Sequence, residues 1–270
     1  MTILIGWIGV DSRRPSSAYL MSDSRISWAT NPNAYDCGRK LFALRNHPDI
    51  LGYCGDVLFP CQFLSQIYEM DSNDILFSNS MTSADRAYTI LNQLNKQYFA
   101  LPEHARGDFT IYHISRDLDL SFCAYKYFYD LSTRAWQIEN INTDIKESTI
   151  IIQAGSGQHA FNELYVNRYK TGDLSGTSRN IHQCLCHMLF QNNEITCGGP
   201  PQLVGLYVGK KFNGISFGII NDGQRYFCGS PCEYRPELSS ICWYNEEFEI
   251  CDGLTMQKRP TAARQPNPNR

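Results

Sequence analysis

Short apolar or alternating runs, separated by turn-forming residues, make up the first 55 positions of the chain. Four such runs lie at residues 1–7, 18–25, 37–44 and 50–55. Because each run is short and is bounded by turn formers, the pattern predicts four strands in series. The polar segment 10–17, between the first two runs, is interpreted as a loop.

The next segments change to helical spacing. Apolar side chains recur every three or four residues in 59–70 and 83–99, which gives each segment one apolar face. Aromatic and β-branched residues then predict strands at 109–113, 120–128 and 135–141. Residues 149–153 are almost wholly apolar, as in a strand that is buried on both faces.

The rest of the chain repeats this order. Helices are predicted at 158–169 and 177–190, followed by three strands at 202–208, 214–220 and 224–228. Strands, two helices, strands, two helices and strands predict an α+β fold, a four-layer αββα sandwich of two stacked, mainly antiparallel sheets with helices outside. We expect one domain over residues 1–256 and a disordered, proline-containing tail over 257–270.

Composition limits the classes of protein that fit. The 270 residues are 43% hydrophobic and 19% charged, as in a soluble globular protein. A net charge of −3 gives no electrostatic reason to expect nucleic acid or an anionic membrane as partner. No apolar run is long enough to span a bilayer, and the first run lacks the basic flank of a signal peptide.

The eleven cysteines do not form a recognisable framework. Their number is odd and no CxxC pair occurs, so we expect reduced thiols in a cytoplasmic protein.

Five motifs in chain order resemble the β-type subunits of the proteasome and their bacterial relatives, the N-terminal-nucleophile threonine peptidases. Thr2 follows the initiator Met, Asp23-Ser24-Arg25 ends the second strand, and Lys40 precedes the third. Gly155-Ser156-Gly157 resembles the turn that opens a helix in this family. Residues 194–199 resemble its Asp-x-x-Ser-Gly-Gly turn, with Glu194 and Cys197 at the two altered positions.

The chemistry of Thr2 can be argued from the residue itself. A hydroxyl is a weak nucleophile until a base takes its proton, and an α-amino group with a pKa near 8 can do so. Only the first residue of a mature chain carries both groups, and we expect Met1 to be removed because Thr2 is small. Taken alone, Thr2 is an ordinary second residue.

The resemblance implies roles for the other residues. Lys40 would act as a cation beside the nucleophile, Asp23 would hold Lys40, and Ser156 would hydrogen-bond the threonine amine. Glu194 and Cys197 would support this group. Without the resemblance, Asp23 and Lys40 fit an ordinary ion pair, and Ser156 fits a helix N-cap.

The resemblance also implies an oxyanion donor among the backbone N–H groups of Cys54, Gly55 and Asp56. Cys54 is in addition a candidate wall of the substrate pocket. The sequence does not indicate which of the three residues supplies the donor.

A metal site is the competing interpretation. His182 and Cys186 have the i, i+4 spacing of zinc ligands, with Cys184 and His187 beside them. We favour packing roles for these residues on an amphipathic helix, and expect neither a metal nor a cofactor.

Three functional classes therefore remain open. The first is a threonine peptidase that cleaves peptides or unfolded proteins inside a proteasome-like ring of identical subunits. The second is a scaffold with the same fold and no catalysis, and the third is an amidase of the wider N-terminal-nucleophile group that acts on a small amide. The resemblance also allows an ATPase partner, which nothing in the sequence identifies.

Overall fold

The computed structural model describes residues 2–11, 14–28, 31–172, 174–191, 197–209, 213–233, 235 and 240–262. The described part is a mixed α/β chain with four α-helices and several antiparallel sheets. The helices are α1 (Leu58–Ser72), α2 (Ser83–Ala100), α3 (Gln158–Leu164) and α4 (Ser178–Gln191), with a 3₁₀ turn η1 (Glu103–Ala105) and a π-helical turn η2 (Tyr165–Tyr169).

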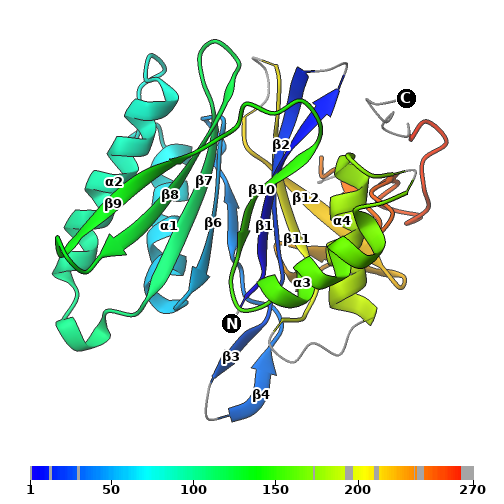
Figure 1. The fold of residues 1–270 in the computed structure, drawn as a ribbon, viewed down its shortest axis with the longest axis horizontal. Coiled ribbons are helices and arrows are strands. Elements are labelled where there is room, and N and C mark those ends of the chain that lie inside the picture. Colours follow the sequence, from blue (N-terminus) through cyan, green and yellow to red (C-terminus); the bar gives the residue numbers. More distant parts are fainter. Residues whose placement is uncertain are drawn as a thin grey trace.

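The strands form two main sheets (Figure 1). One follows the order β10-β1-β2-β11-β12-β13-β14, with β15 and β16 attached through β12, and the other follows β5-β6-β7-β8-β9. β3 and β4 form a separate hairpin. The strands are β1 (Leu4–Asp11), β2 (Arg14–Ser22), β3 (Ile26–Trp28), β4 (Asn31–Tyr35), β5 (Leu41–Ala43), β6 (Asp49–Gly55), β7 (Phe109–Arg116), β8 (Phe122–Asp130), β9 (Ala135–Ile141), β10 (Thr149–Ala154), β11 (Gln202–Tyr207), β12 (Ile215–Asn221), β13 (Gln224–Phe227), β14 (Ser230–Pro231), β15 (Trp243–Tyr244) and β16 (Ile250–Cys251).

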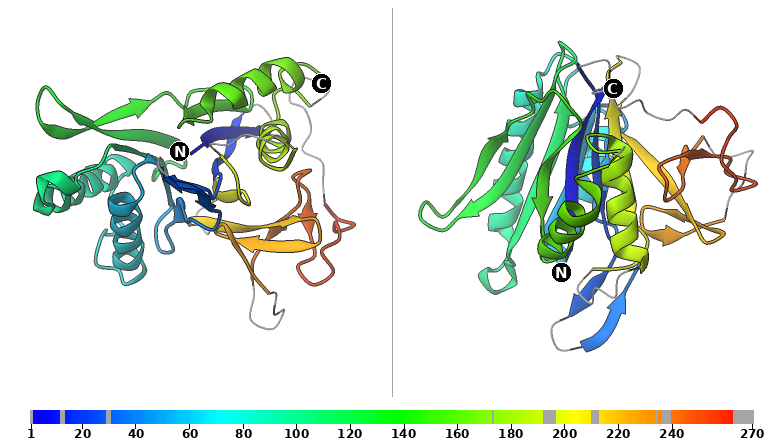
Figure 2. Two further views of the ribbon diagram at one scale, coloured as in Figure 1. Left: turned by 90° about the horizontal axis from the view of Figure 1, so that it is seen from below. Right: turned by 45° about the vertical axis from the view of Figure 1, so that its right-hand side comes forward.

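Strand β1 shows how the layers pack. It is buried on both faces, and successive side chains of a strand point to opposite sides of the sheet. Ile5 and Trp7 pack with apolar side chains of α3 and α4, whereas Leu4 and Ile8 pack with residues of β5, β6 and β7 in the second sheet. Helices α1 and α2 cover the outer face of that second sheet, so the two helix pairs lie on opposite sides of the fold (Figure 2).

The order of helices and strands expected from the sequence is confirmed. The interpretation of 10–17 as a loop is wrong, because β1 continues to Asp11 and β2 begins at Arg14, with Val10 paired to Pro15. The polar side chains in this segment lie at the end of a long hairpin, where strand pairing does not require apolar residues. The strands β3, β4, β14, β15 and β16 were not predicted; apart from β4 they are only two or three residues long.

The segment expected to be a tail begins within the described residues. Lys258 forms an isolated bridge with Cys251, and its Nζ lies 2.6 Å from a carboxylate oxygen of Glu249. Residues 263–270 lie outside the described part of the chain. Among the described helices, none is both long and apolar enough to cross a bilayer.

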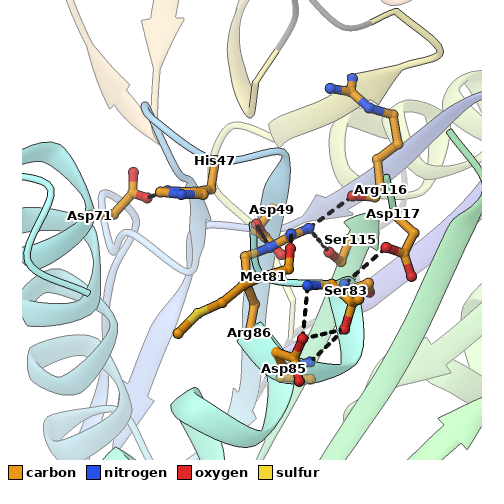
Figure 3. Close-up of polar contacts among 12 residues, drawn as sticks. His47, Asp49, Asp71, Met81, Ser83, Asp85, Arg86, Ser115, Arg116 and Asp117 are labelled. Atoms are coloured by element: carbon orange, nitrogen blue, oxygen red, sulfur yellow. Dashed lines mark hydrogen bonds and ion pairs between the residues drawn. The ribbon is translucent and has the colours of Figure 1, made fainter. Parts of the chain in front are cut away.

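A polar cluster is buried between α2 and the second sheet (Figure 3). Arg86 of α2 donates to Asp49 Oδ2 at 2.8 Å and to Ser115 Oγ at 2.7 Å, and His113 Nε2 lies 2.7 Å from Asp49 Oδ1. Burial alone would raise the pKa of Asp49, but the contacts with His113 and Arg86 outweigh it and hold the pKa below its usual value. Asp49 is therefore a buried carboxylate that needs the guanidinium of Arg86.

We predict that Arg86→Met lowers the free energy of unfolding by about 3–5 kcal/mol, because it leaves the buried carboxylate of Asp49 without its guanidinium. Urea unfolding monitored by circular dichroism measures the change. Lys96→Met is the matched control, since Lys96 is exposed on the same helix and its replacement should change stability by no more than about 0.5 kcal/mol. Equal stability of the two variants would contradict the prediction.

Candidate active site

Thr2 lies just before β1, and its backbone is held from one side. Its N–H donates to Ser156 Oγ at 3.1 Å, and its carbonyl accepts from the N–H of Gly157 at 3.2 Å. Gly155 approaches Thr2 so closely that a Cβ at position 155 would lie 2.1 Å from the Thr2 carbonyl oxygen. Gly155 also has a φ of +95°, which favours glycine. The Gly155-Ser156-Gly157 turn therefore contacts the backbone of Thr2 and leads directly into α3.

Asp23 and Lys40 form an ion pair beside Thr2. The Lys40 Nζ lies 2.7 Å from Asp23 Oδ1, and both side chains are fully buried. Lys40 Nζ also donates to the carbonyl of Arg25 at 2.7 Å. Asp23 Oδ1 accepts the N–H of Ile3 at 3.1 Å, so the pair is joined directly to the residue after Thr2.

The ionisation of Asp23 depends on these partners. Burial raises the pKa of the Asp23 carboxyl, and this rise is opposed by the charge and hydrogen bond of Lys40 and by the N–H groups of Ile3 and Gly198. Four donors reach the two oxygens, because the N–H of Arg25 also points at Asp23 Oδ2. A carboxyl group that accepts from four donors and donates to none is best described as ionised.

Gln202 connects the strands around the ion pair, and the sequence did not reveal it. Its Oε1 accepts from the N–H of Lys40 at 3.0 Å, and its Nε2 donates to the carbonyls of Asp23 and Gly38. A second ion pair, between Arg25 and Asp36, is bidentate at 2.8 and 2.9 Å and closes the base of the β3–β4 hairpin. Only long-range strand order brings Gln202 to its partners, so no local pattern could have found it.

The turn at 197–199 lies against the same group. The N–H of Gly198 donates to Asp23 Oδ2 at 3.2 Å, and its carbonyl accepts from the N–H of Ser24 at 3.0 Å. Cys197 is buried, and its Sγ lies 2.5 Å from the position that a Cβ of Gly157 would occupy. Glu194, the other altered position, lies outside the described residues.

Strand β6 ends at the site with Cys54 and Gly55. The N–H of Asp56 donates to the carbonyl of Asp108 at 2.8 Å, so that group is already used by the sheet. Because backbone groups alternate in direction along a strand, the N–H of Gly55 points away from β7. Burial raises the pKa of the Cys54 thiol to about 11, so the thiol is neutral near pH 7.

A pocket of about 520 Å³ opens beside Thr2. Thr2, Gly155 and Ser156 line one side of it, and Cys54 and Gly55 line another. The segment before β7 and its first residues contribute Gly107, Asp108 and Thr110 to the lining. The rest of the wall is largely aromatic and comes from β7, β8, β9 and the turn after β8: Phe109, Phe128, Tyr129, Leu131 and Trp136. We call this space the apolar pocket. The strand-like aromatic runs were predicted from the sequence, but their position beside Thr2 was not.

The alternative zinc ligands do not assemble. His182 Nδ1 lies 3.7 Å from Cys186 Sγ, and both side chains are buried. Burial lowers the pKa of His182 to about 3, so its ring is neutral. His187 instead lies 2.9 Å from the Tyr169 hydroxyl. Within the described part of the chain, no three His, Cys, Asp or Glu side chains are grouped so that they could hold a metal ion.

Comparison with known proteins supports the fold and not a particular activity. No protein family model and no curated protein sequence matches the chain. A similar solved structure is the Anbu (Gly-1) mutant from Hyphomicrobium sp. strain MC1, with a TM-score of 0.55 and 11% sequence identity. The match covers 79% of this chain and 84% of that chain. Anbu is a bacterial proteasome-like member of the N-terminal-nucleophile hydrolases, so this chain has a proteasome-like fold.

We predict that Gly155→Ala destabilises the protein by about 1–3 kcal/mol more than Gly172→Ala. Both glycines have positive φ values, +95° and +115°, so both substitutions carry a similar backbone strain. Only at position 155 does the new methyl group meet a backbone atom, because nothing lies within 4 Å of the corresponding point at Gly172. Thermal unfolding of the two variants measures the difference, and equal melting temperatures would contradict the contact with Thr2.

We also predict that Lys40→Met destabilises the protein by about 3–5 kcal/mol at pH 7 and by less at pH 4. Without the ammonium, the folded-state pKa of Asp23 rises further. A carboxyl with a raised folded pKa binds more protons in the folded state, so stability is greatest below its unfolded pKa of about 3.9 and is lost as the pH rises. Urea unfolding at several pH values measures this. The double variant Asp23→Asn/Lys40→Met should lose this pH dependence, and its persistence there would assign the effect to another group.

Proposed function

We propose that this chain is a threonine peptidase of the N-terminal-nucleophile type, with Thr2 as nucleophile. The observation that supports this best is the joint placement of Ser156 Oγ at 3.1 Å from the Thr2 nitrogen and of the Asp23–Lys40 pair against Ile3. Proteasome-like folds house such sites, and the described layers are consistent with the αββα sandwich of that group. We further propose that the fold is a single domain.

Removal of Met1 is the first requirement of this mechanism. The Thr2 nitrogen is an amide in the full chain, and loss of residue 1 would convert it into an α-amino group beside its own hydroxyl. The neutral amine then takes the proton of the hydroxyl as Oγ1 attacks a peptide carbonyl carbon. The amine protonates the departing nitrogen, the C–N bond breaks, and an ester with Thr2 remains. Water hydrolyses that ester, with the amine again acting as base.

Lys40 supplies positive charge to this reaction. An ammonium close to the α-amino group disfavours a second positive charge, so it lowers the amine pKa and keeps more of the base neutral near pH 7. Asp23 holds Lys40 in place, and Ser156 orients the Thr2 nitrogen. We assign Glu194 and Cys197 to the support of this group; Cys197 lies beside Gly157, which contacts the Thr2 carbonyl.

Negative charge develops on the carbonyl oxygen of the substrate. We propose that the N–H of Gly55 stabilises it, since the N–H of Asp56 is bound to Asp108. Gly55 has a φ of +106°, and a Cβ there would lie 2.4 Å from the carbonyl oxygen of Asp108. Only glycine therefore fits this position, which also lines the apolar pocket. Cys54, a neutral thiol, contributes to the wall of that pocket.

The substrate class we propose is peptide or unfolded protein. The aromatic wall of the apolar pocket suits a large apolar side chain next to the cleaved bond. We also propose that the chain assembles into a ring of identical subunits, in which the sites face an enclosed space. Native mass spectrometry that detects only a monomer at micromolar concentration would overturn the assembly and leave the chemistry standing.

We predict that Thr2→Ala reduces turnover of a fluorogenic peptide with an apolar residue at the cleaved bond by roughly 10³-fold or more, because no other group replaces the nucleophile. Thr2→Ser should retain part of the activity, since it keeps a hydroxyl on a small second residue. Steady-state kinetics with both variants, and intact mass of the wild type to verify loss of Met1, test the proposal.

The outcomes separate the three functional classes. Unchanged turnover in Thr2→Ala would refute the assignment of the nucleophile. Retained Met1 together with an inactive wild type would favour a scaffold. Hydrolysis of a small acyl amide, with all peptides left intact, would favour the amidase.

A further inference from the structure

Two further hollows continue from the apolar pocket along β10. The first, of about 500 Å³, is lined by Gly155 and Ser156 together with Gln153 and Asn162. Gly155 and Ser156 also line the apolar pocket. The second hollow, of about 460 Å³, shares Gln153 and Asn162 with the first and extends past Val166. The three hollows therefore adjoin one another through shared residues, and we call the two further hollows the β10 groove.

The floor of this groove is the edge of a sheet. Among the described strands, β10 pairs only with β1, so its other edge carries no neighbouring strand. An edge of this kind presents backbone N–H and C=O groups that can pair with an added strand. The strand has six residues, which corresponds to a length of about 20 Å. It ends at Ala154, directly before Gly155 and Ser156, which contact Thr2.

We propose that the β10 groove binds an extended stretch of polypeptide substrate as an additional strand, which leads the chain to or from Thr2. This inference rests on the proposed function and adds to it the mode of substrate recognition. Added strands obtain affinity from main-chain hydrogen bonds, and specificity comes only from pockets for alternate side chains. In this protein the apolar pocket would select one side chain, and the groove would hold the backbone on one side of the cleaved bond.

The groove walls carry polar, charged and apolar side chains, with Glu147 and Lys170 among the charged ones. Gln153 and Asn162 carry neutral amides, and Thr149 adds a hydroxyl, so the walls offer both donors and acceptors. Helix α3 and the turn η2 form the opposite wall, where Val166 is 45% exposed. An extended peptide therefore finds polar partners along its backbone and apolar contacts with Ile150, Ile151, Tyr165 and Val166.

The test compares two fluorogenic peptides that share the same cleaved bond. A tetrapeptide reaches only the apolar pocket, whereas a dodecapeptide extends into the groove. Asn162→Trp places a large side chain in the groove. We expect it to lower kcat/KM for the dodecapeptide about tenfold relative to kcat/KM for the tetrapeptide. Glu163→Trp is the control, because Glu163 is exposed on the same helix and lines neither hollow. We expect this control to leave the ratio unchanged.

N-methylation of the dodecapeptide tests the strand directly. Two versions of the dodecapeptide carry methyl groups on alternate backbone nitrogens, one on the odd and one on the even positions. In an added strand only one of these sets of N–H groups faces β10, so methylation of that set should weaken the reaction far more than methylation of the other. Equal effects of both sets would overturn strand addition. An unchanged ratio in Asn162→Trp would also overturn it.

Binding separates this inference from catalysis. Fluorescence anisotropy with a labelled dodecapeptide and Thr2→Ala needs no turnover, so it tests the groove even if the chain proves to be a scaffold. We expect Asn162→Trp in this background to weaken binding about tenfold and Glu163→Trp to leave it unchanged. Equal affinity in the two would overturn the proposal. A changed sedimentation coefficient in Asn162→Trp alone would also overturn it, since the groove would then hold a second copy of this chain.

Discussion

The buried ion pair between Asp23 and Lys40 is the interaction on which the site depends. Removing two charges from water is unfavourable, and it is offset only if every partner is in place. The carboxylate of Asp23 meets that requirement by accepting from Ile3 before β1, from Gly198 in a distant turn and from Lys40 before β5. Three segments that are remote in sequence are therefore held in one arrangement, because displacement of any of them would leave a buried charge without a partner.

A second buried cluster holds β6, the strand that ends at Gly55, in position. Asp49 begins β6 and is held by Arg86 and His113, whereas the other end of the strand is fixed by the hydrogen bond from Asp56 to Asp108. The Tyr127 hydroxyl lies 2.9 Å from His113 Nδ1 and 3.2 Å from the carbonyl of Ala87 in α2, so the cluster is also tied to that helix. Both ends of β6 are therefore held by buried or backbone hydrogen bonds, and these contacts fix the position of Gly55.

The sequence predicted the elements well and the site only in part. Helical spacing identified α1, α2 and α4, because each buries one face against a sheet. The hairpin β3–β4 was missed because Trp28, Ala34 and Tyr35 are exposed, so its strands need no apolar periodicity. Within the site, resemblance indicated Thr2, Asp23, Lys40 and Ser156. The sequence did not indicate Gln202 because its partners lie more than 160 residues away, and only strand order brings them together.

The register of β1 explains why these residues meet. Leu4 pairs with Ser22 on one side and with Ala154 on the other. Continuing both antiparallel ladders towards the start of the chain brings residue 3 opposite Asp23 and residue 2 opposite Ser156. A slip of one residue would turn every side chain of β1 to the opposite face, and Ile5 and Trp7 would lose their contacts with α3 and α4. The hydrophobic pattern of β1 thus sets the register, and the register places Thr2 between a carboxylate and a hydroxyl.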